Sequence, residues 1–145
     1  GTGEPLDNYE NLLKFLRMLT DENGQNLSMR NVTVSTCGIV PRIYDLAREK
    51  LSITLALSLH ATTDERRREI MPIANTYTIS ECMAACRYYF EETGRRVTFE
   101  YSLIKGVNDS LRDAKELAAL AGSISAHINL IPVNPMCRRT VWPLR

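Results

Sequence analysis

Four short segments rich in β-branched and aliphatic residues, each preceded by a longer segment with helical periodicity, constrain the fold of this chain most. The strand-like segments are residues 32–36, 53–59, 97–104 and 127–132. The helical segments are residues 9–20, 41–49, 78–93 and 108–121. Strands that alternate with helices of this length are typical of repeated βα units, in which neighbouring strands run parallel. The sequence therefore predicts an α/β fold with a parallel sheet of about four strands.

The composition fits one domain and leaves the class of partner open. With 145 residues, 44% of them hydrophobic, such a domain buries roughly two thirds of its unfolded surface. The net charge of +1 neither favours nor excludes an RNA partner. No apolar run approaches the roughly 20 residues that a membrane helix needs, so we expect no membrane partner. The four cysteines are too few for a disulfide scaffold, and we expect reduced thiols and a cytoplasmic location.

Capping residues mark the ends of two helices. Asp7 with Glu10 predicts a capping box at the start of the helix over residues 9–20. Thr78 with Glu81 predicts another at the start of the helix over residues 78–93, and Gly94 ends that helix.

The polar connection over residues 61–77 carries a run of three arginines, residues 66–68. A helical turn capped by Thr62 and Glu65 is expected there. Because this turn follows a strand, the arginines would lie on the ligand side of the sheet, where RNA phosphates could approach. A solvated helix face neutralised by the neighbouring carboxylates explains the same pattern, and the sequence leaves both readings open.

The Gly3-Glu4-Pro5 run has the character of a corner between a strand and a helix. Glycine permits a close backbone approach, and proline stops a strand. The Glu4 carboxylate could hold the cationic amine of a small ligand. Only Gly1 and Thr2 precede the run, so we expect this chain to be part of an enzyme whose preceding strand it lacks.

Polar side chains gather at the carboxyl ends of the predicted strands, which is where parallel α/β folds bind their ligands. In chain order, the residues at these ends are Ser35 and Thr36, then Ser58, Leu59 and His60, then Glu100, Tyr101 and Ser102, and finally Asn129 and Asn134. Strand alternation places Ser58 and His60 on one face and Leu59 on the other. The sequence therefore predicts a site for a polar ligand at this rim.

A series of segments in a fixed order makes the interpretation more specific. They are GTGEPLDN (1–8), LSMRNVTVSTCG (27–38), LALSLHA (55–61), IMPI (70–73), VTFEY (97–101), GVND (106–109) and INLIPVNP (128–135). In these segments the chain resembles the middle of the radical S-adenosylmethionine (SAM) methyltransferases that modify C2 of adenine in 23S ribosomal RNA and transfer RNA. The resemblance implies a partial parallel (βα) barrel of the radical SAM type without its first strands, formed by residues 1–135. Residues 136–145 would be a divergent or truncated tail.

The resemblance also implies a set of SAM-binding residues. Gly3 and Glu4 would contact the methionyl part of SAM, with Glu4 accepting a charge-assisted hydrogen bond from the ammonium group. Ser35, the triplet Ser58, Leu59 and His60, and Asn134 fall on the family's other SAM-binding positions. The parent protein would be a cytoplasmic enzyme that acts on 23S rRNA and tRNA and is a monomer when intact.

The family holds a 4Fe-4S cluster with a Cys-x3-Cys-x2-Cys motif that lies before the Gly-Glu-Pro corner, and this sequence does not contain it. Cys82 and Cys86 imitate the first spacing, but no third cysteine follows, and both lie on the apolar stripe of their helix. We therefore expect them to pack in the core. Cys137 does not match the cysteine that the family methylates.

No residue of this chain is predicted to be catalytic or to bind a metal, and the chain alone is expected to be inactive. Two other readings stay open: an α/β module that binds a nucleotide-like ligand, and an inactive truncation product.

Overall fold

The structure, a computed structural model, describes residues 3–133. It contains a four-stranded sheet in the order β1-β2-β3-β4, in which every neighbouring pair is parallel. The strands are β1 (Thr33–Thr36), β2 (Thr54–Ser58), β3 (Thr98–Leu103) and β4 (His127–Pro132). The predicted α/β fold with four parallel strands is confirmed.

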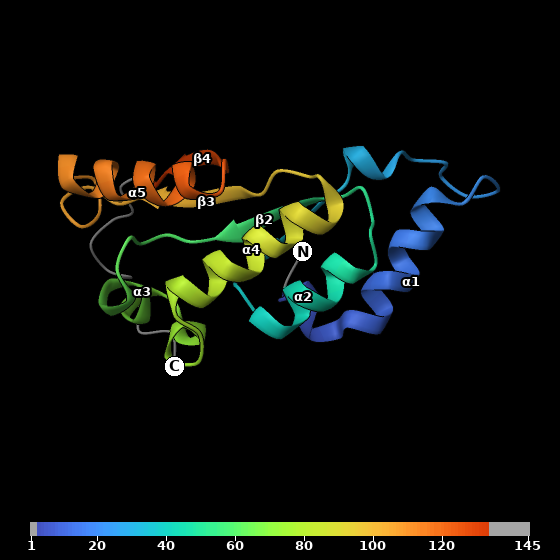
Figure 1. The fold of residues 1–145 in the computed structure, drawn as a ribbon, viewed down its shortest axis with the longest axis horizontal. Coiled ribbons are helices and arrows are strands. Elements are labelled where there is room, and N and C mark those ends of the chain that lie inside the picture. Colours follow the sequence, from blue (N-terminus) through green and yellow to red (C-terminus); the bar gives the residue numbers. More distant parts are fainter. Residues whose placement is uncertain (1–2, 134–145) are drawn as a thin grey trace.

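Five α-helices and three 3₁₀-helices connect these strands within the described residues (Figure 1). The α-helices are α1 (Tyr9–Thr20), α2 (Val40–Arg48), α3 (Asp64–Ile70), α4 (Ile79–Thr93) and α5 (Leu111–Ser123). The 3₁₀-helices are η1 (Pro5–Asn8), η2 (Met29–Asn31) and η3 (Pro72–Asn75). Helices α2 and α4 pack against each other and cover the sheet, as Figure 1 shows.

The two faces of the sheet differ in chemistry because successive side chains of a strand point to opposite sides. One face is apolar and buried beneath the helices; it carries Val34, Leu55, Leu57, Phe99 and Tyr101. We call the other side the open face, defined by Thr33, Ser35, Thr54, Ala56, Ser58, Thr98, Glu100 and Ser102. Most of these residues are at least partly exposed, and only Ala56 is buried.

The core lies between the apolar face and helix α4. Cys82 and Cys86 are both fully buried in it, which confirms that they pack in the core. The Tyr89 ring is also fully buried, and its hydroxyl donates to the carbonyl oxygen of Ile53 at 2.9 Å. This bond satisfies a phenol that would otherwise be costly to bury.

The predicted ends of α4 are correct, whereas the cap predicted for α1 is wrong. Thr78 and Glu81 form a capping box, and Gly94 ends the helix with a φ of 66°. Asp7 does not cap α1, because the chain already turns in η1, whose cap is Glu4. Proline at the first position of this turn favours the early start.

The start of α3 also differs from the prediction, by one residue. Thr63 caps the helix by accepting from the backbone N–H of Arg66. The Thr62 hydroxyl instead donates to Glu116 at 2.6 Å and so ties this loop to α5. A Thr-Thr pair offers two possible caps, and the sequence alone does not distinguish them.

Candidate functional site

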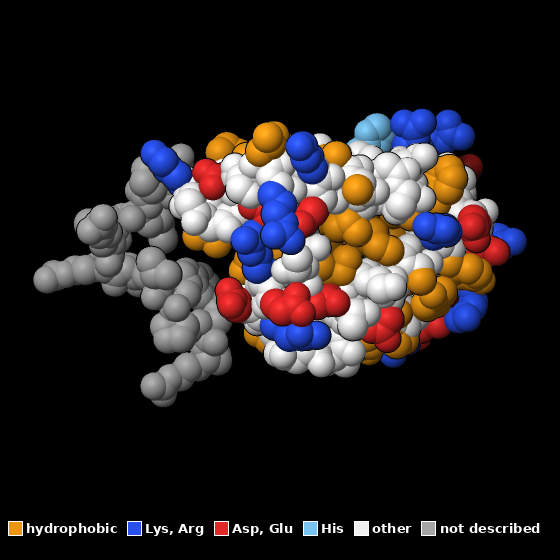
Figure 2. Space-filling model, turned by 60° about the vertical axis from the view of Figure 1, so that its left-hand side comes forward, with side chains coloured by type: hydrophobic (Ala, Val, Ile, Leu, Met, Phe, Trp, Pro, Cys, Tyr) orange, Lys and Arg blue, Asp and Glu red, His pale blue; other side chains and the backbone are white. Residues whose placement is uncertain are grey.

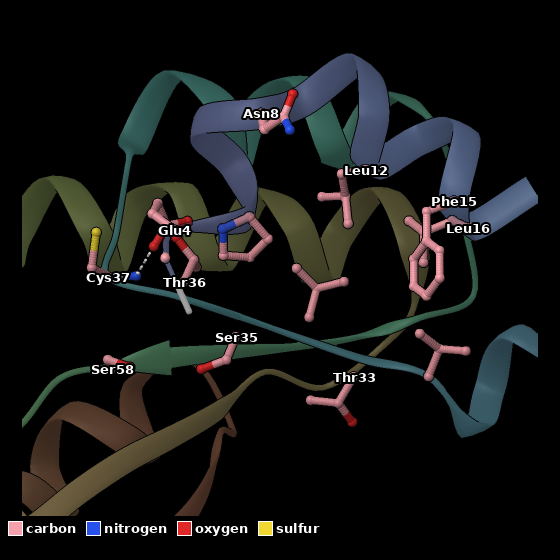
Figure 3. A pocket seen from close by; sticks show the side chains of 14 residues that line it. Glu4, Asn8, Leu12, Phe15, Leu16, Thr33, Ser35, Thr36, Cys37 and Ser58 are labelled. Atoms are coloured by element: carbon pink, nitrogen blue, oxygen red, sulfur yellow. Dashed lines mark hydrogen bonds between the residues drawn. The ribbon is translucent and has the colours of Figure 1, made fainter. Parts of the chain in front are cut away.

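A cleft of about 880 Å³ lies between α1 and β1 and extends along β1 as far as Cys37 and Ser58 at the carboxyl end of the sheet (Figure 3). Leu12, Phe15 and Leu16 of α1 form its apolar wall. The polar residues on the other sides include four of the predicted site residues: Gly3, Glu4, Ser35 and Ser58. Segments far apart in the sequence thus meet at one hollow, as a ligand site requires.

The Glu4 carboxylate is fixed at the rim of this cleft by two backbone donors. Oε1 accepts from the N–H of Leu6 at 3.1 Å, and Oε2 accepts from the N–H of Cys37 at 2.7 Å, the bond drawn in Figure 3. A carboxylate has about four acceptor positions, so Glu4 retains capacity for a further donor. Gly3 precedes it with a φ of 120°, and no atom lies within 4 Å of the place where a Cβ would stand. The backbone is therefore open to a ligand here.

Ser35 and Ser58 lie on the open face, where both bind the same carboxylate. The Ser35 hydroxyl donates to Oε2 of Glu100 at 2.9 Å, and the Ser58 hydroxyl donates to it at 3.4 Å. Ser58 and Glu100 are direct partners in the register of β2 and β3. The sequence marked Glu100 only as one polar group at a strand end and did not reveal that it joins the two serines.

Leu59 and His60 do not contribute side chains to the cleft. The Leu59 side chain is fully buried, so only its backbone could meet a ligand. His60 has a φ of 58°, and its Nδ1 accepts from the N–H of Ser102 at 3.1 Å. Burial lowers the pKa of His60, although the Glu100 carboxylate opposes this shift. The ring is therefore neutral near pH 7 and helps to join the ends of β2 and β3.

Asn108 holds the same two strand ends together, although the sequence indicated it only as the first residue of the helical segment 108–121. Its side-chain amide donates to the carbonyl oxygens of His60 at 3.0 Å and Ser102 at 2.8 Å. Its Oδ1 accepts from the N–H of Ile104 at 2.7 Å. Ser110 provides the actual cap of α5, which leaves the buried Asn108 free for this role.

Arg67 is fully buried, contrary to both sequence readings of the arginine run. Its guanidinium donates to the carbonyl oxygens of Cys37 at 2.7 Å, Ser58 at 3.2 Å and Leu59 at 3.3 Å. These carbonyl groups lie at the carboxyl ends of β1 and β2, so Arg67 holds the ends of these two strands together. Buried charges require such compensation, and the regular charge run in the sequence gave no sign of it.

The two flanking arginines are also placed differently from each other. Arg66 pairs with Asp113 of α5, and Arg68 is exposed. Figure 2, which views the side with α3 and α5, shows basic and acidic side chains close together on this surface. A run of arginines on α3 therefore does not form one continuous basic surface for RNA.

The thiols near the cleft are protonated and do not form a metal site. Burial raises the pKa of Cys37 to about 12, and the adjacent Glu4 carboxylate adds to the shift. Burial also raises the pKa values of Cys82 and Cys86. Among residues 3–133, no group of three or more His, Cys, Asp or Glu side chains could hold a metal ion.

None of the helices in this part of the chain is both long and apolar enough to cross a membrane.

Two predicted features lie outside the described residues: Asn134 and the tail over residues 136–145. Cys137 lies outside them as well. Of the predicted site residues, the structure therefore brings Gly3, Glu4, Ser35 and Ser58 together at the cleft. Leu59 and His60 do not line it.

Comparison with known proteins gives close matches that extend over nearly the whole chain. A probable dual-specificity RNA methyltransferase RlmN of Lachnospira eligens is 61% identical over 139 residues, covering 96% of this chain and 40% of that protein. One from Clostridium botulinum strain Alaska E43 is 59% identical over 140 residues, covering 97% of this chain and 40% of that protein. The chain thus spans about two fifths of the length of these curated relatives.

A solved structure and a family model agree with these matches. The crystal structure of a radical SAM methyltransferase from Sphaerobacter thermophilus superposes with a TM-score of 0.88 at 52% identity, covering 93% of this chain and 40% of that one. This match confirms the predicted partial barrel of the radical SAM type. The model of the radical SAM superfamily matches residues 1–118. With more than half of its length matched, this chain belongs to the radical SAM superfamily.

Proposed function

We propose that this chain is the SAM-binding part of an enzyme that methylates C2 of adenine in 23S rRNA and tRNA. Support comes from the two relatives described as dual-specificity RNA methyltransferases and from the superfamily match over residues 1–118. Residues 1–135 are proposed as a partial radical SAM core and residues 136–145 as a divergent or truncated tail. The intact protein is proposed to be a cytoplasmic monomer.

The cleft between α1 and β1 fits the aminoacyl end of SAM. Glu4 lies at the rim with acceptor capacity to spare, and a charge-assisted hydrogen bond to an ammonium is about twice as strong as a neutral one. Gly3 exposes its backbone beside it. Ser35 and Ser58 extend the polar surface along the open face. Leu59 through its backbone, His60 and Asn134 complete the proposed set.

The described residues do not fit a 4Fe-4S cluster, since they contain no group of metal-binding side chains. The superfamily uses this cluster to cleave SAM reductively. We propose that a Cys-x3-Cys-x2-Cys motif of a longer protein holds it and that the 145-residue chain alone does not methylate RNA. An electron paramagnetic resonance signal from a site-bound 4Fe-4S cluster on this chain, after reconstitution, would contradict this proposal.

The single observation that carries the SAM assignment is the meeting of Glu4, Ser35 and Ser58 at one cleft. Calorimetric titration of the full natural protein with SAM tests it. We expect Glu4→Gln to weaken binding by about tenfold because the charge on the acceptor is lost. The matched control is Glu10→Gln, an exposed carboxylate on α1, which should leave the dissociation constant unchanged. Equal effects of the two substitutions on the dissociation constant would contradict the assignment of SAM to this cleft.

The RNA substrates require a separate measurement. The full natural protein is expressed in a bacterial host that lacks its own adenine-C2 methyltransferase, and nucleosides from purified 23S rRNA and tRNA are analysed by mass spectrometry. We expect 2-methyladenosine in both RNAs and less of it with the Glu4→Gln variant at low expression. Methylation of one RNA alone would restrict the proposal to that substrate, and methylation of neither would refute it.

A further inference from the structure

The amino ends of β1, β3 and β4 carry a row of basic side chains, which we call the amino rim and define by Arg30, Arg95, Arg96 and His127. Arg30 lies in η2 before β1, the two neighbouring arginines lie before β3, and His127 begins β4. In Figure 1 the carboxyl end of β2 points toward α3, and the amino rim lies at the opposite end of the sheet. None of the four residues lines the cleft proposed for SAM.

Hydrogen bonds connect the amino rim across the sheet. The Arg95 guanidinium extends toward β2, where its Nη2 donates to the Thr54 hydroxyl at 3.1 Å and to the carbonyl oxygen of Arg30 at 3.3 Å. On the other side of β3, the N–H of His127 donates to the carbonyl oxygen of Val97 at 2.9 Å. The rim therefore runs across the sheet from β1 to β4, in which neighbouring strands lie about 4.8 Å apart.

The positive charges of the amino rim have no carboxylate partner in the part of the chain that the structure describes. None of its three arginines takes part in the ion pairs found there, whereas the exposed Arg48 of α2 pairs with a carboxylate of its own helix. Arg30 and Arg96 are exposed. Arg95 is half-buried, and its Nε has no hydrogen-bond partner among the described residues. The rim thus presents uncompensated guanidinium groups with donors to spare.

A chain of phosphates is the ligand chemistry that such a row of arginines fits. Arginine binds phosphate through two parallel hydrogen bonds, and its guanidinium keeps its charge throughout the physiological pH range. Basic side chains arranged as a stripe are the electrostatic footprint of a nucleic acid, whose backbone repeats the same charge at short intervals. The amino rim contains no tyrosine, phenylalanine or tryptophan on which an unpaired base could stack, so its chemistry suits the backbone of an RNA and not its bases.

We propose that the amino rim binds the phosphate backbone of the RNA substrate, as a second contact away from the SAM cleft. This inference rests on the proposed function, because it takes an RNA as the partner. Strand β3 has six residues, so the two ends of the sheet are only about 20 Å apart, and a folded RNA larger than this reaches both. Phosphate contacts carry no sequence information. One rim therefore serves 23S rRNA and tRNA alike.

RNA binding at a series of salt concentrations tests this proposal. The full natural protein and its double variant Arg30→Gln, Arg96→Gln are titrated with an unmodified tRNA transcript and with a 23S rRNA fragment that contains the target adenine. Fluorescence anisotropy gives the dissociation constants. We expect the double variant to bind both RNAs about tenfold more weakly in about 0.1 M KCl. The slope of log K against log salt should fall by about 1.5, since each phosphate contact contributes about 0.7–0.9.

Two further variants separate the loss of charge from a change in structure. Arg48→Gln removes the same charge from an exposed arginine that already has a carboxylate partner, and it should leave the salt slope unchanged. The double variant Arg30→Lys, Arg96→Lys keeps both charges and should restore the slope. Thermal unfolding verifies that each variant is folded.

The outcomes distinguish this inference from the proposed function. Unchanged affinity and salt slope in the glutamine variant, an effect on one RNA alone, or lysine substitutions that do not restore the slope would each overturn this inference and leave the proposed function standing. Wild-type protein that binds neither RNA would instead overturn the proposed function, and this inference with it.

Discussion

The guanidinium of Arg67 donates to the carbonyl oxygen of Cys37 at 2.7 Å, and the N–H of the same Cys37 donates to Glu4 at 2.7 Å. Helix α3 is thereby connected through one residue to the carboxylate at the rim of the cleft. Because Arg67 is fully buried, the position of this rim depends on an interaction beneath the surface.

Arg67→Met should destabilise the protein strongly. The substitution keeps an aliphatic side chain but removes the donors to the carbonyl oxygens of Cys37, Ser58 and Leu59, which lie in partly or fully buried hydrogen bonds. Unsatisfied buried groups of this kind cost about 3 kcal/mol or more in total. Urea denaturation measures the loss in unfolding free energy. Arg68→Met, on the exposed side of the same helix, is the control and should change stability by less than about 0.5 kcal/mol.

Gly38→Ala should destabilise the protein, whereas Gly122→Ala should stabilise it. Gly38 has a φ of 102°, and an added Cβ would lie 3.2 Å from Cys82 Sγ and 3.3 Å from an Arg67 nitrogen. We expect a cost of about 1–3 kcal/mol from strain and crowding. Gly122 lies in α5 with no atom within 4 Å of its added Cβ, and alanine there should gain about 0.5–1 kcal/mol. Thermal unfolding of the two variants would show opposite shifts; shifts of the same sign would contradict the placement of Gly38.

Tyr89→Phe should cost about 1 kcal/mol, because it removes the donor to the buried carbonyl oxygen of Ile53 and keeps the ring. The bond measures 2.9 Å. Tyr88→Phe alters the neighbouring, half-buried tyrosine of α4 and should be nearly neutral. Chemical denaturation of both variants distinguishes the loss of this bond from a general effect of the substitution; a neutral Tyr89→Phe would disprove the role given to the hydroxyl.

Stability should fall as the pH is lowered through the titration of His60. Burial lowers the pKa of His60 in the folded state below the ordinary 6.5, so the unfolded state binds the proton first. The contribution is complete above the unfolded pKa and is lost as the pH falls below it. Unfolding free energy measured from about pH 7.5 to about pH 5 should show this decline.

The variant His60→Asn should remove most of that pH dependence. Asparagine tolerates the positive φ at this position and does not titrate. His127 is the other histidine of the chain, and it is exposed, so His127→Asn should leave the decline intact. A decline that persists in His60→Asn would assign it to other groups.

Local patterns in the sequence predicted the elements and much of the site. β-Branched runs, capping boxes and Gly94 are local signals, and the strand over residues 127–132 and the helix over residues 9–20 match the structure to the residue. The placement of Ser35 and Ser58 at one edge followed from the rule that parallel strands end at the same edge, whereas Glu4 was joined to them by the family resemblance.

Long-range hydrogen bonds explain what the sequence could not show. Arg67 looks like any residue of a charged run, and only the folded chain brings it beneath the carbonyl oxygens of two strands. Glu100 likewise meets Ser35, which is 65 positions away in the sequence, only in the folded chain.

Residues that support the fold and residues that face the cleft alternate along the same strands: Leu57 is buried where Ser58 is not. Neighbouring positions can therefore change independently, since one contributes to the stability of the fold and the next to the binding of a ligand. Replacing a serine on the open face can change specificity at little cost in stability. An insertion or deletion of one residue within β2 would move the buried side chains to the open face and the polar side chains into the core. Such a change would damage stability and ligand binding together.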